Sequence, residues 1–443
     1  MKRNENWRTR VRALATVFML AVAALPAQAQ QLSNFDRDRG KTMLNTVKNE
    51  IKKSYYDPNF HGLDIEARFK EAEEKMKQAT SLGQVFGIIA QAVMDLDDSH
   101  AFFIPPSRTT RVEYGWEMQM IGDKCYVVAV KPGSDAEAKG LKVGDEVFTV
   151  SGFGPTRENL WKMNYLFRVL RPQPGLRVQL LDPDGSQRQM DVMAKVTQEK
   201  QVVNLTGSDG GNDIWDLIRD SENDAYFNRH RYYEMGDIFV WKMPRFDLME
   251  KGVDEMMGKV LKSKALILDL RGNPGGYVVT LQRMLGYFVE KDIKIGDEKR
   301  RKETKPLMAK ARDRAFKGKL VVLVDSQSGS SAEVFSRVVQ LEKLGTVIGD
   351  RTPGAVMAAR HFSFEMGADT IVSYGASITV ADLIMTDGKS LERTGVTPNE
   401  LLLPTRADIA ARRDPVLARA AELVGLSLDA EKAGALFPIE WRK

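Results

Sequence analysis

The stretch LVVLVDSQSGSSAE, residues 320–333, decides the fold class of this chain. It begins with a short apolar run, 320–324, and continues with small and polar residues before a second apolar-periodic stretch. This order predicts a buried strand that turns sharply into a helix. A small hydroxyl residue on such a turn lies where α/β folds present a nucleophile.

A second stretch, ALILDLRGNPGG at residues 265–276, predicts another buried strand, which ends in a glycine-rich loop. From about residue 237 onward, strand-like runs alternate with segments of helical periodicity. The expected strands are 238–243, 265–270, 320–324 and 347–349, and the expected helices are 248–262, 277–289 and 331–343. This alternation is typical of an α/β core built from βα repeats.

The rest of the chain divides into regions of different pattern. Residues 30–108 carry apolar residues at helical spacing, such as Leu44, Val47 and Ile51, and predict an N-terminal helical region. Residues 109–195 alternate strand-like runs with turn signals and predict a separate β-module. We expect a linker or insertion at 196–236, the α/β core at 237–405 with a β-rich stretch at 361–380, and a helical tail at 406–443 that includes a helix at 412–426.

The first 29 residues have the pattern of a secretory signal peptide. Basic side chains precede an apolar run at 13–25, and residues 27–29, Ala-Gln-Ala, supply a small-x-small cleavage pattern. The alternative is a membrane anchor, which the short apolar run and the cleavage pattern disfavour. We therefore expect an exported protein, periplasmic or secreted after cleavage near Ala29, without a stable membrane anchor.

The composition argues against several functional classes. The chain has 443 residues, 43% hydrophobic and 28% charged, as ordinary globular domains have. Its formal charge of +5 comes mostly from the first 29 residues, because the remaining 60 basic and 59 acidic side chains almost balance. We therefore expect no nucleic-acid partner. We also expect no metal or cofactor, since the sequence holds no metal-ligand cluster. The single cysteine, Cys125, is expected to be a buried core residue.

Ser99 and His100 are adjacent near the end of the N-terminal helical region. A serine hydroxyl is a weak nucleophile at neutral pH, and it needs a base such as imidazole to take its proton. His100 is therefore the candidate base. Of the other histidines, His361 opens a predicted strand and is the runner-up, whereas His61 and His230 lie in a turn and in an irregular segment.

Several of these segments together resemble a known family. Residues 269–276, D-L-R-G-N-P-G-G, resemble the D-x-R-x-N-x-G-G motif of the carboxyl-terminal processing (tail-specific) proteases and of the tricorn protease core. Residues 328–333 resemble the nucleophile turn of that family, residues 395–399 resemble its G-V-x-P-D ending, and the β-module resembles its PDZ domain. The resemblance covers about residues 35–425. It implies an α/β serine peptidase core of ClpP/crotonase-like βα repeats, an inserted PDZ β-module and an N-terminal helical region.

The resemblance implies that Ser330 is the nucleophile, three residues before the glutamate that ends the segment. Ser328 and Ser331 are the competing serines, whereas Ser326 and Ser336 are expected to be structural. A serine beside a turn is more often a helix cap than a nucleophile. The motif context is therefore what favours Ser330.

One position departs from the bacterial tail-specific proteases, whose general base is a lysine in a G-E-x-T-x-G-K segment after the serine. Ala355 stands at the matching position here. The tricorn-like branch instead uses a Ser-His pair and a late glutamate that acts through the serine of the pair. This chain has such a pair and also has Glu392. The resemblance therefore implies a catalytic tetrad of Ser330, His100, Ser99 and Glu392.

The reaction also needs donors for an oxyanion and a place for the substrate. Backbone N–H groups of a glycine-rich loop and of the first residue of a helix suit the oxyanion, which nominates Gly275, Gly276 and Ser331. The PDZ resemblance implies that a peptide binds through its carboxyl terminus, by β-addition, at Tyr114, Gly115, Trp116 and Glu117.

These expectations combine into an exported serine endopeptidase that cleaves protein or peptide substrates, recognised through their C-terminal ends. Ala355 motivates the alternative, a catalytically inactive peptide-binding or scaffold protein with the same fold. A different hydrolase on this core is the third reading, and a lysine such as Lys389 stays open as the base. The sequence predicts neither the oligomeric state nor whether the PDZ-like module activates or inhibits.

Overall fold

The computed structural model describes residues 32–107, 110–182, 185–198, 229–367 and 371–441. The predicted signal peptide, 1–29, lies outside these residues, as does most of the predicted linker. Within the described ranges, no helix combines the length and the hydropathy that crossing a membrane requires.

The α/β core contains a six-stranded sheet. The strands predicted at 238–243, 265–270, 320–324 and 347–349 all belong to it. Its spatial order is β18-β15-β14-β11-β10-β9, and all neighbours are parallel except the antiparallel edge strand β9. The strands are β9 (Arg231–Met235), β10 (Ile238–Lys242), β11 (Ala265–Asp269), β14 (Lys319–Val324), β15 (Thr346–Gly349) and β18 (Glu400–Leu401).

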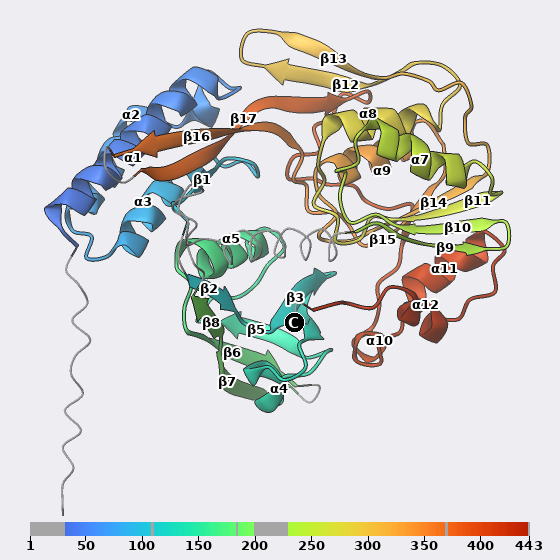
Figure 1. Cartoon of the computed structure of the whole chain (residues 1–443), viewed down its shortest axis with the longest axis horizontal. Coiled ribbons are helices and arrows are strands. Elements are labelled where there is room, and N and C mark those ends of the chain that lie inside the picture. Colours follow the sequence, from blue (N-terminus) through green and yellow to red (C-terminus); the bar gives the residue numbers. More distant parts are fainter. Residues whose placement is uncertain (1–31, 108–109, 183–184, 199–228, 368–370, 442–443) are drawn as a thin grey trace, which may run out of the picture.

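Helices cover both faces of this sheet, which explains why its central strands carry consecutive apolar residues such as 265–268 and 320–324 (Figure 1). Leu268 of β11 packs in one cluster with α7 (Glu250–Val260), α8 (Val278–Gly286) and α9 (Ser331–Leu341). Its neighbour Ile267 packs on the other face with α11 (Pro415–Leu423) and α12 (Ala430–Leu436). The predicted tail helix at 412–426 is therefore one of three short helices, the first being α10 (Arg406–Ala410).

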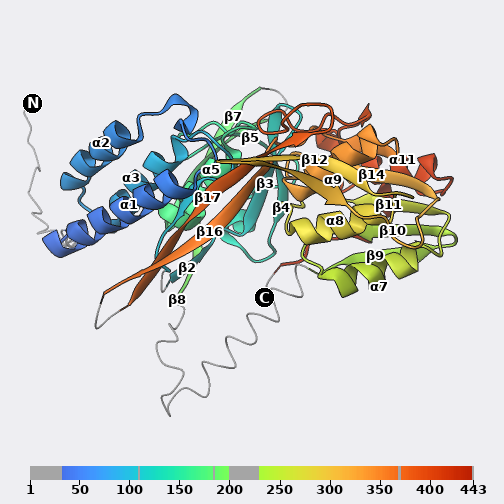
Figure 2. The same ribbon diagram turned by 90° about the horizontal axis from the view of Figure 1, so that it is seen from above.

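A second sheet joins the N-terminal region to the core. The long strand β17 (Val372–Met385) pairs along one edge with β16 (Met357–Met366), and along the other edge with β1 (Phe102–Ile104) and β12 (Ile293–Arg300), which pairs in turn with β13 (Thr304–Ala309). The helices α1 (Asn34–Ser54), α2 (Ile65–Lys77) and α3 (Leu82–Met94) pack against this sheet, and a short helix, η1 (Phe60–Gly62), joins the first two (Figure 2). Because β1 follows His100 directly, this pairing brings the Ser-His pair to the core.

The β-module, residues 110–198, is an antiparallel sheet in the order β3-β4-β5-β6-β7 with its own apolar core. Its elements are β2 (Thr110–Glu113), β3 (Trp116–Ile121), β4 (Lys124–Val130), α4 (Asp135–Ala138), β5 (Glu146–Val150), α5 (Leu160–Tyr165), η2 (Leu166–Leu170), β6 (Gly175–Leu181), β7 (Gln187–Met193) and β8 (Lys195–Gln198). It contacts the core through Gln119, whose Nε2 donates to Asp325 Oδ2 at 2.7 Å, and through an Arg157–Asp350 ion pair of 2.9 Å.

Two boundaries differ from the prediction. The segment 196–236 was expected to be a linker, but its first residues belong to β8 of the β-module and its last ones to β9 of the core sheet. The hairpin of β12 and β13 was not expected, because its strands carry many charged residues and lack the apolar alternation of a half-buried strand. The β-rich stretch predicted at 361–380 lies within the two strands β16 and β17, which extend away from the core.

Candidate active site

Ser330 occupies a strained turn between β14 and α9. Its φ of 52° and ψ of −118° lie in a region that non-glycine residues rarely adopt. Two acceptors hold the turn: Ser330 N donates to Glu333 Oε2 at 3.0 Å and to the carbonyl oxygen of Ala355 at 2.9 Å. A strained residue that its surroundings hold in place is a frequent feature of functional sites.

Glu333 is the buried anchor of this turn. It is fully buried, and besides the Ser330 N–H its oxygens accept the N–H groups of Gly354 and Ala355 at 2.8 and 2.9 Å and the hydroxyl of Thr352 at 2.5 Å. Burial raises the pKa of Glu333 to about 7, although these hydrogen bonds favour the ionised form. The carboxyl group therefore joins the Ser330 turn to the loop 352–355.

The structure brings Ser99, His100 and Glu392 together. Ser99 Oγ lies 2.7 Å from His100 Nδ1 and donates to Glu392 Oε2 at 2.8 Å, while Ser99 N donates to Glu392 Oε1 at 2.8 Å. Ser99 and Glu392 are separated by 293 positions, and the pairing of β1 with β17 is what makes the contact possible. Burial raises the pKa of Glu392, which the hydrogen bonds from Val356 N and Ser99 counteract.

The hydrogen bonds also assign the tautomer of His100. A serine hydroxyl has one proton, and Ser99 gives it to Glu392. His100 Nδ1 must then carry its own proton and donate it to Ser99 Oγ, which leaves Nε2 with the free lone pair. Burial lowers the pKa of His100, the charge of Asp98 opposes this shift, and the charge of His361 adds to it. A neutral imidazole with a free Nε2 is the form that a general base needs.

A two-residue segment connects Ser330 to this group. Ala355 O accepts the N–H of Ser330, and the next N–H, that of Val356, donates to Glu392 Oε2 at 2.9 Å. Ala355 thus lies beside the nucleophile turn, where the lysine of a Ser-Lys dyad was expected. The backbone of Ala355 is bonded at both of its polar groups, because its N–H donates to Glu333 Oε2 and its carbonyl oxygen accepts the N–H of Ser330.

The glycine-rich loop packs directly against Ser330. A Cβ atom added to Gly275, whose φ is +100°, would come within 2.6 Å of Ser330 Cβ and 3.0 Å of Ser331 N. Ser331 Oγ donates to the carbonyl oxygen of Gly276 at 3.2 Å. All three residues nominated for the oxyanion therefore lie beside Ser330.

The three backbone N–H groups of these residues differ in availability. Gly275 N already donates to Asn273 Oδ1 at 2.8 Å. For the N–H groups of Gly276 and Ser331, the described residues offer no acceptor. Of the two glycines, Gly276 is therefore the one whose N–H group can still donate to an oxyanion.

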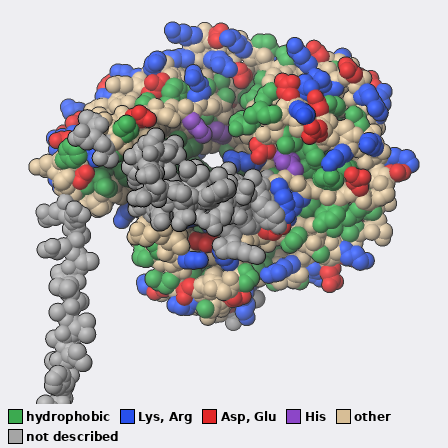
Figure 3. Space-filling view, in the orientation of Figure 1, with side chains coloured by type: hydrophobic (Ala, Val, Ile, Leu, Met, Phe, Trp, Pro, Cys, Tyr) green, Lys and Arg blue, Asp and Glu red, His purple; other side chains and the backbone are tan. Residues whose placement is uncertain are grey.

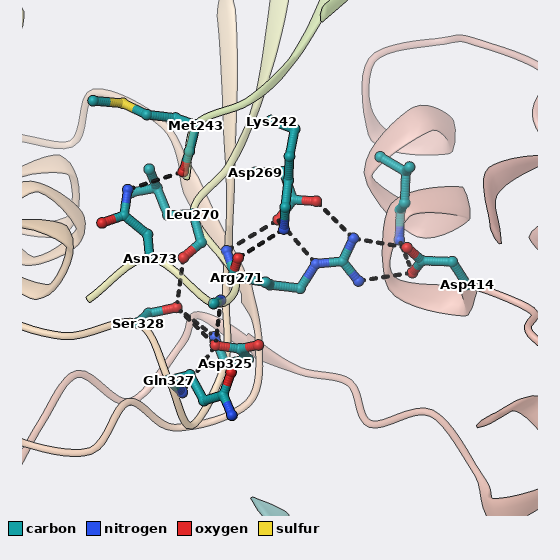
Figure 4. A network of polar contacts seen from close by, with 12 residues as sticks. Lys242, Met243, Asp269, Leu270, Arg271, Asn273, Asp325, Gln327, Ser328 and Asp414 are labelled. Atoms are coloured by element: carbon teal, nitrogen blue, oxygen red, sulfur yellow. Dashed lines mark hydrogen bonds and ion pairs between the residues drawn. The ribbon is translucent and has the colours of Figure 1, made fainter. Parts of the chain in front are cut away.

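Buried ion pairs hold the base of the loop (Figure 4). The guanidinium of Arg271 pairs with Asp269. Its Nη1 and Nη2 also donate to the two carboxylate oxygens of Asp414, the N-cap residue of α11, at 2.9 and 2.7 Å. Lys242 Nζ lies 3.2 Å from Asp269 Oδ1. Asn273 then ties the loop to the nucleophile segment, since its carbonyl accepts Gly329 N at 2.8 Å. Arg271 and Asn273 thus hold the loop in place.

The competing residues have other partners. Ser328 is fully buried and donates to Leu270 O at 2.9 Å, and Ser326 Oγ donates to Met120 O of the β-module. Lys389 lies exposed in the turn after β17. Burial raises the pKa of Cys125 to about 12, so this thiol stays protonated. His361 is exposed on β16, with its ring edge-on to Phe102 at 6.2 Å between centroids.

The predicted peptide-binding residues lie at the open edge of β3. Tyr114 and Trp116 are buried, and the Tyr114 hydroxyl donates to Phe167 O at 3.0 Å. Glu117 forms a bidentate ion pair with Arg168 across the groove between β3 and η2. The described residues provide no acceptor for the backbone N–H groups of Tyr114 and Gly115.

The surface around the site is mixed in charge. On the face seen in Figure 3, basic and acidic side chains are interspersed, as the nearly balanced composition predicts. Histidine side chains lie close to an opening near the middle of this face. Groups of three or more residues that could hold a metal ion do not occur among the described residues.

Sequence reasoning missed Glu333 and Asp98 as organisers of the site. Glu333 entered it only as a motif position, and Asp98 was not singled out. Their roles depend on which distant backbone groups reach them. A polar residue inside an otherwise apolar or glycine-rich segment was the available signal, because buried polar groups need partners.

A strained serine at the start of a helix, a histidine with a free nitrogen and a glycine-rich loop define the class of an α/β serine hydrolase. Comparison with known proteins makes this class specific. Residues 237–402 match the sequence profile of peptidase family S41. This segment is a peptidase family S41 domain, which confirms the resemblance drawn from the motifs, and the chain is a serine-type peptidase.

Two proteases are similar to this chain in sequence. The chain is 22% identical over 380 residues to the carboxy-terminal processing protease CtpA of Bacillus subtilis (strain 168), covering 83% of this chain and 68% of the relative. It is 25% identical over 302 residues to the tail-specific protease of Haemophilus influenzae, covering 64% of this chain and 39% of the relative.

Solved structures share the fold. Mature CPAF superposes with a TM-score of 0.62 at 17% identity, covering 84% of this chain and 94% of CPAF. The photosystem II D1 C-terminal processing protease superposes with a TM-score of 0.50 at 17% identity, covering 90% of this chain and 99% of that protein. The peptidase fold therefore extends beyond the residues that the family profile matches.

Proposed function

We propose that this protein is an exported serine endopeptidase that cleaves proteins or peptides with Ser330 as nucleophile and His100 as general base. The observation that carries the proposal is the hydrogen-bonded group of His100, Ser99 and Glu392, linked to the Ser330 turn through Ala355 and Val356. Export rests on the signal-peptide pattern of residues 1–29.

In the first step, Ser330 Oγ attacks the scissile carbonyl carbon and its proton passes to His100 Nε2. The imidazolium then gives that proton to the leaving amine, and an acyl-enzyme remains. Water attacks the ester in the second half, again with His100 as base. Ser99 holds Nδ1–H through its oxygen, and Glu392 holds Ser99, so the pair acts as the orienting third group of a triad.

The oxyanion of both tetrahedral intermediates would lie against the N–H groups of Gly276 and Ser331. Both groups lack an acceptor among the described residues, and both lie beside Ser330. Ser331 N is also the first N–H of α9, where the helix leaves its donors unpaired. Gly275 contributes by leaving room for the substrate rather than by donating.

The β-module is proposed to act as a PDZ-like domain inserted into a ClpP/crotonase-like core. The free edge of β3 offers a partner for an extended peptide, and the N–H groups of Tyr114 and Gly115 suit a terminal carboxylate. Substrates would then be recognised through their C-terminal ends. A peptide whose terminal carboxylate is amidated should consequently show a higher KM than the free acid.

The test is cleavage of a permanently unfolded protein by the chain without residues 1–29. Ser330→Ala and His100→Ala should each reduce peptide release by about 10⁴-fold or more, while Ser336→Ala serves as the matched control. Ser336 lies in the same helix and its hydroxyl binds only the Ala332 carbonyl within the described structure. Cleavage that persists in Ser330→Ala would refute the assignment of the nucleophile.

The same experiment addresses the alternative of an inactive scaffold. That alternative expects no cleavage by the wild type and cleavage after Ala355→Lys. We favour the active enzyme, because the group of Ser99, His100 and Glu392 is bonded to the Ser330 turn through the backbone of Ala355 and Val356.

A further inference from the structure

Asp98 is a buried carboxylate that the proposed reaction does not yet use. It directly precedes Ser99 and is 3% exposed. Within the described structure no lysine or arginine forms an ion pair with it, whereas its exposed neighbour Asp97 pairs with Arg393. An unpaired buried carboxylate is costly, so its surroundings should show what stabilises it.

One oxygen of Asp98 organises the turn that carries the pair. Oδ1 accepts His100 N at 2.9 Å, Ala101 N at 2.6 Å and the hydroxyl of Thr379 from β17 at 2.9 Å. The other oxygen, Oδ2, is buried and has no hydrogen-bond partner among the described residues, and the same holds for the hydroxyl of Tyr55. The carboxylate is therefore fixed in place through Oδ1, while burial and, after it, an interaction with the Asp98 carboxylate raise the pKa of the Tyr55 hydroxyl.

The position matters because of how His100 is supported. In a Ser-His-Asp triad the carboxylate binds the imidazole directly and stabilises the imidazolium. Here the direct partner of Nδ1 is the neutral hydroxyl of Ser99. Glu392 lies one step further away, behind that hydroxyl, whereas Asp98 is bound to the main chain of His100 itself.

Resting on the proposed function, we infer that Asp98 is a positioning residue of the peptidase: it fixes the Ser99–His100 turn and supplies the negative charge that stabilises His100 while His100 carries the proton of Ser330. The proton moves from Ser330 Oγ to His100 Nε2 and then to the leaving amine, and Asp98 takes no proton in either step. The negative charge of Asp98 favours the imidazolium form of His100.

The charged groups that face this region limit what a pH profile can report. Glu392 and His361 face the pair from the loop after β17 and from β16. Tyr55 and Tyr56 face Asp98 from the end of α1, and burial, first among the causes, raises the pKa of both phenols, so they stay neutral. Because the two phenols carry no charge, the neighbours of the pair whose charges must stay the same between variants are Glu392 and His361.

The test compares Asp98→Asn with Asp97→Asn in cleavage of a peptide. Asparagine keeps an oxygen for the three donors and removes the charge. We expect Asp98→Asn to lower kcat about tenfold and to move the acidic limb of kcat/KM about one unit to lower pH. KM should stay unchanged, and Asp97→Asn should match the wild type. If Asp98→Asn does not fold, Asp98→Ser takes its place, because serine is also neutral and its hydroxyl also accepts backbone N–H groups.

An unchanged kcat with an unmoved limb would overturn the inference, and so would a loss of kcat without a shift, because a purely structural role predicts that pattern. Failure of the proposed function is separable. If His100→Ala cleaves as well as the wild type in the same assay, the base is wrong, whereas an inactive His100→Ala beside an unaffected Asp98→Asn removes only the role of Asp98.

Discussion

The cluster around Asp269 and the cluster around Ser99 both bury carboxylates, but they compensate the charge in opposite ways. Asp269 lies between Arg271 and Lys242, whose charges hold its pKa well below the usual value despite burial (Figure 4). The Ser99 cluster contains Glu392 and Asp98, and neither forms an ion pair with a lysine or arginine of the described chain. Burial accordingly raises the pKa of Glu392.

The difference separates structure from chemistry. A carboxylate fixed by arginine and lysine is ionised at every working pH and cannot assist a proton transfer, so the Asp269 cluster suits a clamp between the core sheet and α11. Neutral donors do not compensate the charge of a carboxylate. The charge of such a carboxylate is balanced only when the neighbouring imidazole becomes protonated. This is the arrangement that stabilises a transient imidazolium.

The largest expected effect breaks the second cluster. In Glu392→Gln, the carboxylate, which can only accept a hydrogen bond, is replaced by an amide, which can also donate one. The Ser99 hydroxyl then need not donate to residue 392, so the tautomer of His100 is no longer fixed. We expect kcat to fall by about 10³-fold to 10⁴-fold, as the loss of a triad carboxylate does, with little change in melting temperature. Peptide kinetics and thermal melts measure both. Asp387→Asn, in the turn just before Glu392, is the control, because its partner Arg337 is remote from the pair. A kcat near that of the wild type would remove Glu392 from the mechanism.

Breaking the first cluster should affect stability instead. Arg271→Gln leaves Asp269, 1% exposed, with Lys242 as its remaining charged partner beside the backbone N–H of residue 271, and we expect the free energy of unfolding to fall by about 3 kcal/mol. Asp414→Asn keeps the pair of Arg271 with Asp269, so its loss should be smaller, about 1 kcal/mol. Urea unfolding at pH 7 measures both. If Arg271→Gln instead lowered kcat of the folded protein as strongly as Glu392→Gln, the two clusters would not be functionally distinct.

The two kinds of carboxylate also predict opposite responses to pH. The folded pKa of Asp269 is depressed, so its stabilising contribution is present above about pH 4 and is lost as the pH falls below that value. Glu333 has a folded pKa raised to about 7, so its contribution is complete below about pH 4.5 and is lost as the pH rises through 7. The free energy of unfolding of the wild type relative to Glu333→Gln should therefore decrease by about 3 kcal/mol between pH 4.5 and pH 7.5.

Urea titrations of the wild type and Glu333→Gln at both pH values measure this difference. Arg271→Gln serves as the comparison, because its destabilisation should hardly change over the same range. A difference between wild type and Glu333→Gln that is independent of pH would show that Glu333 is ionised throughout.

The smallest expected effect is that of Ala355→Lys. Since His100 already has a free Nε2 to take the proton of Ser330, we do not expect the amine of an added lysine to be needed as a base; the backbone of residue 355 stays bonded to Glu333 and Ser330. We expect no gain in kcat, and none when the change is made in His100→Ala. Cleavage restored in that double variant would indicate a Ser-Lys dyad that this chain can still form.

The α/β core was predictable because its strands are buried on both faces. Uninterrupted apolar runs such as 320–324 can only be central strands or buried helices, and the turn residues that follow decide between these two options. The hairpin of β12 and β13 and the edge strand β9 were not predictable, because exposed strands carry charged residues whose order shows no period. Their positions depend on pairing with distant strands.

The site was predictable to the level of residue types but not of contacts. Ser330, Ser99, His100 and Glu392 followed from motif order, and the proposed roles of these residues await the variants described above. The preference for Gly276 over Gly275 depends on which amide the side chain of Asn273 takes. The contact of Asp98 with Thr379 spans 281 positions, and no local pattern encodes it.

The most direct test of the central claim is covalent labelling with a serine-directed phosphonate, followed by intact mass and peptide mapping. We expect one adduct on Ser330 of the wild type and none on Ser330→Ala. Labelling of His100→Ala and Glu392→Gln should be strongly slowed. Folded Arg271→Gln should be labelled at the wild-type rate. An adduct on another serine, or labelling of His100→Ala as fast as that of the wild type, would contradict this claim.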